Sequence, residues 1–189
     1  MKRIFLFIVI TLVIAPASHA QRLIPGQRGL QLSAGVPVTG SKLFENDDFT
    51  AGIAMTINRK RANQWLFGLE YTKKHLAYRK MLIPSETFAF EGGYLLNLFS
   101  DVRKNVLLNT GLTAVAGYET VNRGEKLLPD GATLLTRDRF VYGGAYHLAL
   151  DIFVTDNFVL FVKGKCSVLW GSDVERFRPQ IQTGIKIVF

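Results

Sequence analysis

The sequence predicts an all-β protein, an eight-stranded antiparallel up-and-down β-barrel of the outer-membrane type. Three observations lead to this prediction. Apolar and polar residues alternate with a period of two along eight segments, and helical periodicity is nearly absent. Aromatic residues gather near the ends of these segments. The connections between the segments alternate in length.

The N-terminal stretch "MKRIFLFIVITLVIAPASHAQR" is expected to lie outside the barrel. It has a basic start, an apolar run from Ile4 to Ala15 and a small residue at Ala20, the pattern of a cleaved secretory signal. A membrane-spanning helix needs about 20 apolar residues, and this run is shorter. We therefore predict a signal peptide over residues 1–20 and a single β-barrel domain over residues 21–189.

Each of the eight segments has two different faces, because side chains on a strand point alternately to opposite sides. The segments are, in chain order, "RGLQLSAGV", "DFTAGIAMTIN", "QWLFGLEYT", "TFAFEGGYLLNL", "NVLLNTGLTAVAGY", "RFVYGGAYHLALDIFV", "NFVLFVKGKCSVLW" and "RFRPQIQTGIKIVF". In the same order, the apolar faces carry Leu30 and Leu32; Phe49 and Ile53; Trp65 and Phe67; Phe88 and Phe90; Leu108 and Leu112; Phe140 and Tyr142; Phe158 and Leu160; and Ile185 and Ile187. The opposite faces carry Gln31; Thr56; Glu70; Glu91; Asn109 and Thr113; His147 and Asp151; Lys163 and Lys165; and Gln182 and Lys186.

Periodicity alone does not tell which face points inward. A soluble barrel of the lipocalin type would hold the apolar faces inside, and a membrane barrel would turn them toward lipid. The aromatic residues favour the membrane barrel, because they form two groups, one near each end of the strands. Trp65, Phe158 and Phe189 lie near one end, and the other end has Phe49, Tyr71, Tyr118, Phe140, Tyr142, Trp170 and Phe177.

The connections favour the membrane barrel as well. "PVTGSKLFEND", "HLAYRKMLIPSE" and "ETVNRGEKLLPDGATLLTRD" are expected to be long loops, whereas "RKRAN", "SDVRKN" and "TDN" are short. Membrane barrels alternate short periplasmic turns with longer outer loops, and an even number of strands keeps both ends on the short side. The chain also closes its last strand on Phe189, which we interpret as a signal for the membrane-insertion machinery.

The polar faces predict a structural cluster inside the barrel. Its expected members are Glu70, Glu91, His147, Lys163, Lys165 and Lys186. Charges left unpaired in such an interior would be strongly destabilising, so we expect them to pair with one another. A catalytic or ion-binding role for the same set is the alternative. Eight strands leave an interior that side chains can fill, which makes a lone barrel a poor channel.

The sequence contains few residues that could indicate catalysis or cofactor binding. Cys166 is the only cysteine, so no internal disulfide can form. His147 and Asp151 share a strand face but lie about 13 Å apart, too far for a direct dyad. No glycine-rich phosphate loop and no metal-ligand spacing occurs, so we predict no enzyme activity, no cofactor and no metal. The net charge of +8 resides partly in loops such as "YTKKHLAYRK", which suit solvent or lipid phosphates better than nucleic acid.

Three stretches resemble one protein family. "QRLIPGQRGLQLSAG", "LLPDGATLLTRDRFVYGGAYHLALDIFVTDNFVLFVK" and "LWGSDVERFRPQIQTGIKIVF" are similar to the TraO proteins of conjugative transposons from Gram-negative gut anaerobes. The resemblance implies a component of a conjugative, type IV-like DNA-transfer apparatus in the cell envelope, with other transfer proteins as partners. The loop residues Leu128, Pro129, Asp130 and Gly131 are the candidate protein contact, with an ordinary surface loop as the alternative.

Three functions remain open at this point. The leading one is a non-enzymatic outer-membrane subunit of the mating apparatus in a Gram-negative cell. The second is a general outer-membrane scaffold or adhesin. The third is a periplasmic ligand-binding barrel. The oligomeric state is not predictable from the sequence.

Overall fold

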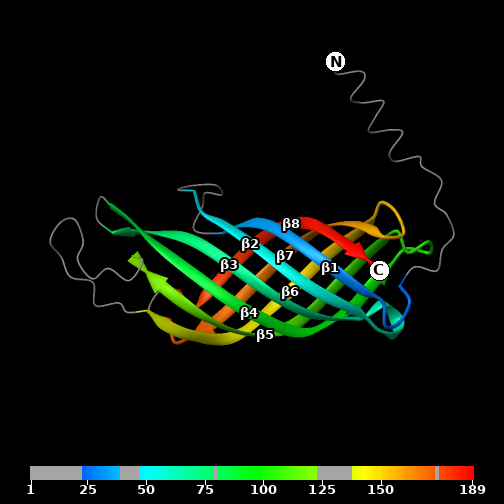
Figure 1. The fold of residues 1–189 in the computed structure, drawn as a ribbon, viewed down its shortest axis with the longest axis horizontal. Helices are drawn as coiled ribbons and strands as arrows, with labels where there is room; N and C mark the ends of the chain where they lie inside the picture. The colour runs from blue at the N-terminus through cyan, green and yellow to red at the C-terminus, as the bar shows by residue number, and fades with distance from the viewer. Residues whose placement is uncertain (1–22, 39–46, 79–80, 123–137, 173–174) are drawn as a thin grey trace, which may run out of the picture.

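The computed structural model describes residues 23–38, 47–78, 81–122, 138–172 and 175–189. These residues form a closed barrel of eight strands (Figure 1). The predicted fold is therefore confirmed. The predicted signal peptide, residues 1–20, and the loop residues Leu128, Pro129, Asp130 and Gly131 lie outside the described residues. No helix among the described residues has the length and apolar character needed to span a membrane.

The strands follow one another around the barrel in sequence order, each antiparallel to its neighbours. They are β1 (Arg28–Pro37), β2 (Phe49–Asn58), β3 (Gln64–Tyr78), β4 (Met81–Ser100), β5 (Val106–Val121), β6 (Arg139–Phe153), β7 (Phe158–Trp170) and β8 (Phe177–Val188). A short 3-10 helix, η1 (Lys60–Ala62), joins β2 to β3.

The closure between β1 and β8 fixes the tilt of the strands. The shear can be read by following cross-strand partners once around the barrel, from β1 through β8 and back to β1. This path begins at Pro37 and ends at Gln27, passing through Gln180, Lys165, His147, Gly111, Leu95, Gln64 and Asn58. The path thus returns to the chain about ten residues before its starting point. Such a shear tilts the strands and gives a narrow barrel that side chains can fill.

Both ends of the barrel sequence lie on the short-turn side, as the even number of strands requires (Figure 1). The backbone nitrogen of Phe189 donates to the Arg28 oxygen at 2.9 Å, and the Arg28 nitrogen donates to the Phe189 oxygen at 3.1 Å. We call this end of the barrel the short-turn rim. The opposite end carries the connections from β1 to β2, β3 to β4, β5 to β6 and β7 to β8, and we call it the loop rim.

The polar faces point inward and the apolar faces outward. Residues such as Gln64, Asn109 and His147 are buried, whereas Leu69, Phe88 and Leu112 are exposed. This arrangement excludes the lipocalin-type alternative, in which the apolar faces fill the interior.

Among the described residues, three groups of buried apolar side chains interrupt the polar interior, and two of them form layers near the rims, while the third consists of Ala54, Leu66 and Leu95. The first, the Leu23 layer, lies at the short-turn rim and consists of Leu23, Leu107, Phe153, Val159 and Val188. The second, the Val141 layer, lies toward the loop rim and consists of Ala89, Val115, Val141, Ala145 and Leu169. Buried polar side chains, together with Phe161 and the group of Ala54, Leu66 and Leu95, occupy the space between the two layers.

A turn brings Leu23 into the first layer. In the sequence Ile24-Pro25-Gly26-Gln27, the Gln27 nitrogen donates to the Ile24 oxygen at 3.1 Å, and Gly26 has a φ of 94°. Proline at the second position and a left-handed glycine at the third are the signature of a type II turn. The turn folds the segment before β1 back over the barrel mouth, where Leu23 is only 9% exposed.

The prediction of a long loop over "HLAYRKMLIPSE" is wrong. β3 continues to Tyr78 and β4 begins at Met81, and the two pair along this whole stretch. They form a hairpin that extends past the neighbouring strands (Figure 1). The cluster of basic residues and Pro84 concealed the strand pattern in the sequence. Pro84 is tolerated because β5 pairs with β4 only from Ser85 onward, so no neighbour on that side needs its missing N–H.

Candidate functional site

Among the described residues, the most deeply buried charges gather in three groups, and in each group the Lys and Arg side chains equal the Asp and Glu side chains in number. The central cluster consists of Glu70, Glu91, His147, Lys163, Lys165, Gln180 and Gln182. The Lys186 cluster consists of Lys186, Asp151, Gln64 and Asn109. The Arg178 cluster consists of Arg178, Glu119, Ser85 and Thr87. These side chains point inward because every second residue of a strand lies on the same face.

Lys165 is the hub of the central cluster. Its Nζ lies 2.9 Å from Oε1 of Glu70 and 2.7 Å from Oε2 of Glu91, with its side chain 1% exposed. Lys163, two residues earlier on β7, reaches Oε1 of Glu91 at only 4.0 Å. Because β7 lies opposite β3 in the strand order, the Lys165–Glu70 pair spans the barrel interior.

Glutamines complete the coordination of Glu70. Gln180 Nε2 donates to Oε1 at 3.2 Å, and Gln182 Nε2 donates to Oε2 at 2.8 Å. Both come from β8, so the Glu70 carboxylate accepts hydrogen bonds from two strands on the far side. A buried carboxylate with this number of donors is well compensated for its loss of hydration.

His147 is fully buried beside the ion pairs. Its Nε2 lies 2.8 Å from Thr113 Oγ1 and 3.6 Å from Glu91 Oε2. Asp151, four residues along β6, turns instead toward the short-turn rim. There its Oδ2 lies 2.7 Å from Lys186 Nζ and accepts from Asn109 Nδ2 at 3.1 Å. The two residues therefore belong to separate clusters.

The Arg178 cluster lies near the loop rim. Arg178 Nη2 contacts both Glu119 oxygens at 3.0 Å and donates to Ser172 Oγ at 2.7 Å. Ser85 Oγ donates to Glu119 Oε1 at 3.2 Å. This pairing joins β8 to β5 and again crosses the interior.

The structure brings together five of the six predicted cluster residues. Lys186 is the exception, because it pairs with Asp151 outside the central cluster. Sequence reasoning did not include Arg178, Glu119, Gln180 and Gln182. Counting alternate positions from Lys186 on β8 identifies Arg178, Gln180 and Gln182 as inward, and counting from Asn109 on β5 does the same for Glu119.

Within the described part of the chain, the interior charges are arranged in pairs. The cations lie against the carboxylates, and among the described residues no group of three or more His, Cys, Asp or Glu side chains could hold a metal. We therefore interpret the interior as a charge-paired filling. The role of these residues as a structural plug stays a prediction.

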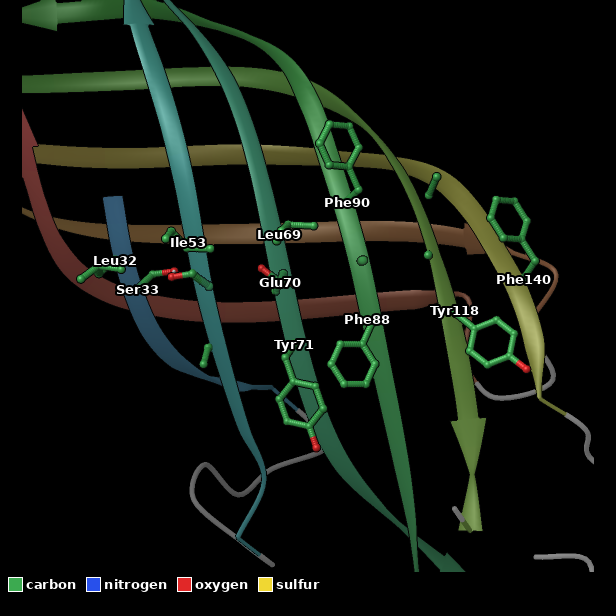
Figure 2. A pocket seen from close by; sticks show the side chains of 15 residues that line it. Leu32, Ser33, Ile53, Leu69, Glu70, Tyr71, Phe88, Phe90, Tyr118 and Phe140 are labelled. Atoms are coloured by element: carbon green, nitrogen blue, oxygen red, sulfur yellow. The ribbon is translucent and has the colours of Figure 1, made fainter. Parts of the chain in front are cut away.

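The outer surface is apolar and carries a groove of about 750 Å³ across β1 to β6. Figure 2 shows its wall, where the rings of Tyr71, Phe88, Tyr118 and Phe140 lie toward one end of the patch. Tyr71 contacts Phe88 and Phe49, with ring centroids 4.7 Å and 5.6 Å apart. At the other end, Trp65 meets Tyr94 edge-on at 4.9 Å. Aromatic rings therefore flank the apolar band at both rims.

The predicted insertion residue, Phe189, is 66% exposed and ends the closing strand at the short-turn rim. Its role in insertion stays a prediction.

The short-turn rim is strongly basic. Its cations are Arg28, Arg59, Lys60, Arg61, Arg103 and Lys104, all exposed, while the described acids at this rim are Asp101 and Asp156. Arg61 and Lys104 have left-handed backbone conformations, with φ of 61° and 53°. Tight turns thus display the cations at the barrel edge.

An apolar outer band between aromatic rims, a closed sheet and a polar filled interior define the class of eight-stranded outer-membrane-type β-barrels. Solved structures of this class resemble the chain. Neisserial surface protein A has a TM-score of 0.59 and 14% identity, over 87% of this chain and 97% of that one. A second structure is that of Ail, the attachment invasion locus protein of Yersinia pestis, in complex with the heparin analogue sucrose octasulfate. It has a TM-score of 0.55 and 14% identity, over 88% of this chain and 100% of that one.

The family model described as conjugative transposon protein TraO matches residues 24–189, so the chain belongs to the TraO family. No match was found among curated proteins. At this level of identity, the structural likeness concerns the fold alone.

Proposed function

We propose that this protein is a non-enzymatic outer-membrane subunit of the conjugative apparatus that moves a transposon between cells. The membership of residues 24–189 in the TraO family carries the proposal. Residues 1–20 direct export, and the barrel enters the outer membrane with its short-turn rim toward the periplasm. The apparatus resembles type IV secretion in that it spans the envelope.

The filled interior supports a structural rather than a conducting role. Four interior side chains are each at most 1% exposed: Leu107, His147, Val159 and Phe161. DNA therefore does not pass through the barrel. The barrel acts through its rims, where other transfer proteins bind, and the loop from Leu128 to Gly131 is the first candidate contact.

The experiment is the transfer frequency of the transposon from a donor with this gene deleted, then complemented. We expect a drop of several decades, restored by complementation, with normal donor growth. Unchanged transfer in the deleted donor would contradict the proposal. Outer-membrane fractions run with and without boiling test the barrel separately, because a closed barrel resists detergent until it is heated.

A general adhesin is the second candidate, because the fold resembles Ail, which was solved with a heparin analogue. In that case, a donor with the loops shortened would lose surface attachment while its transfer frequency stays unchanged. The transfer-subunit proposal thus predicts a change in transfer frequency, whereas the adhesin proposal predicts a change in surface attachment.

A further inference from the structure

The short-turn rim carries a groove in which cations and aromatic rings lie together. Its walls are formed by Pro25, Arg59, Lys60, Arg61, Asn63, Trp65 and Tyr94, and its volume is about 680 Å³. The three cations belong to the turn between β2 and β3. The two aromatic residues are cross-strand partners on the outward faces of β3 and β4.

We propose that this groove binds the headgroup of an anionic phospholipid in the periplasmic leaflet. The inference rests on the outer-membrane location that we propose for the barrel. It adds a ligand that neither the fold nor the family assigns.

The groove is held in place by its own backbone. The Arg59 nitrogen donates to the Asn63 oxygen at 2.7 Å, which closes the turn. Asn63 Oδ1 accepts a hydrogen bond from the Asn97 nitrogen at 3.0 Å, which fixes the turn to the bulge in β4. Arg61 and Ala62 both adopt left-handed conformations, with φ of 61° and 60°, without being glycine. Such strain persists where the surrounding structure holds it and is frequent at ligand clamps.

The charges have no partner in the interior network. Arg59, Lys60 and Arg61 are exposed and take part in none of the ion pairs of the three interior clusters. Their positive charges therefore face the surroundings of the barrel. Cations next to a membrane surface attract anionic headgroups and contribute about fivefold in affinity each.

The aromatic residues select a lipid over an acidic protein. Trp65 is 38% exposed and lies against Tyr94 with ring centroids 4.9 Å apart. Amphipathic rings of this kind lie at the headgroup level of a bilayer. The groove is therefore continuous with the lipid-facing surface, so a phospholipid can place its phosphate among the cations and its glycerol against the rings.

The test compares binding of phosphatidylglycerol and phosphatidylcholine to the chain folded in detergent micelles, measured by native mass spectrometry. The test variant is Arg59→Gln/Lys60→Gln/Arg61→Gln. The matched control is Arg103→Gln/Lys104→Gln on the neighbouring turn, which removes cations from the same rim, including one with left-handed backbone. We expect the unaltered chain and the control to prefer phosphatidylglycerol. The test variant should lose about fivefold in that preference for each cation removed, and the control should lose less for each cation.

Three results would overturn the inference. The test variant could keep its preference, or the control could lose as much per charge, which would mean diffuse attraction. Displacement of phosphatidylglycerol by polyglutamate at equal charge would indicate an acidic protein as the partner. Gel mobility before and after boiling distinguishes a failure of the lipid site from a failure of the proposed membrane location. A heat-resistant barrel without lipid preference rejects only the lipid site, and a chain that forms no such barrel rejects its membrane location as well.

Discussion

At the residue scale, the interior depends on side chains that reach across the barrel. Lys165 meets two carboxylates that come from β3 and β4, and Arg178 on β8 meets Glu119 on β5. Each pair links strands that are not neighbours. A buried pair contributes little net stability compared with apolar packing, but the loss of one partner leaves an uncompensated charge. We therefore expect the stability of the barrel to depend on keeping both partners of each pair rather than on the net contribution of the pair.

The first prediction concerns Lys165→Met. The variant leaves Glu70 and Glu91 without their common cation, so we expect the free energy of unfolding to fall by about 3–5 kcal/mol. The matched control is Lys163→Met, a change of the same chemistry on the same strand at a 4.0 Å contact, and we expect less than half that loss. Urea unfolding in lipid vesicles, followed by tryptophan emission, measures both. Equal losses would show that Lys165 is not the hub.

A second prediction concerns Gly184 on β8, which makes room for the inward ring of Phe161. A Cβ at Gly184 would lie 2.7 Å from Phe161 Cζ and 2.0 Å from the Leu32 backbone oxygen. We expect Gly184→Val to lower the free energy of unfolding by about 1–3 kcal/mol through overpacking. At Gly164, which faces outward on β7, a Cβ meets only the Leu148 oxygen at 3.9 Å. Gly164→Val is therefore the control and should leave the urea midpoint unchanged. A similar midpoint shift in both variants would contradict this account.

At the element scale, the segment before β1 acts as a cap on the short-turn rim. The type II turn at Pro25 and Gly26 returns the chain over the barrel mouth, and Leu23 packs against Leu107 and Val188. Leu23 has a φ of 64°, a conformation that a leucine adopts only where its contacts hold it. The turn and the packing of Leu23 together hold the segment over the barrel mouth.

Leu23→Asp tests the cap. Asp adopts the left-handed conformation more readily than Leu, so any loss of stability reports the burial of a carboxylate in an apolar layer. We expect the free energy of unfolding to fall by at least about 2 kcal/mol. Ile24→Asp, at a neighbouring position that is 48% exposed, is the control and should change it little. Indistinguishable urea midpoints for the two variants would mean that Leu23 does not pack in the mouth.

The strands themselves were predictable because each carries a clear two-faced pattern. Trp65, Phe67 and Leu69 alternate with buried Leu66 and Glu70, as expected from the sequence. The end of β3 was not predictable, because the barrel wall no longer divides the surroundings into two environments there. Beyond Tyr71 the residues include Lys73, Lys74 and His75. Only pairing identifies them as a strand, with β4 at all three positions and also with β2 at Lys73.

At the scale of the whole molecule, one part of the candidate site was predictable from the sequence and another part was not. Strand parity placed Glu70, Glu91 and Lys165 inside, but it carries no information about which inward residues meet. Those contacts depend on the shear of the closed sheet, which brings side chains of β8 to Glu70 on β3 and joins Lys186 to Asp151 instead of the central cluster. The cap at Leu23 was missed for a similar reason, since its partners lie far along the chain.

The same architecture places the two tryptophans at opposite rims of one apolar band. Trp65 lies at the start of β3 near the short turns, and Trp170 ends β7 near the loops; they are 38% and 47% exposed on the outer face. Aromatic residues of a membrane barrel lie at the two interfaces, whereas the band between them faces the acyl chains.

The test measures tryptophan fluorescence in bilayers of brominated lipids. The Trp170→Phe variant leaves Trp65 as the probe, and the Trp65→Phe variant leaves Trp170. We expect the emission of each to be quenched most by bromine near the headgroup. The control is Leu112→Trp in a chain with both substitutions, because Leu112 lies in the middle of β5 and is 68% exposed. Its emission should be quenched most by bromine deep in the acyl chain. Equal quenching at all depths, or none, would mean that this band does not face lipid, and the barrel would then have to be covered by protein.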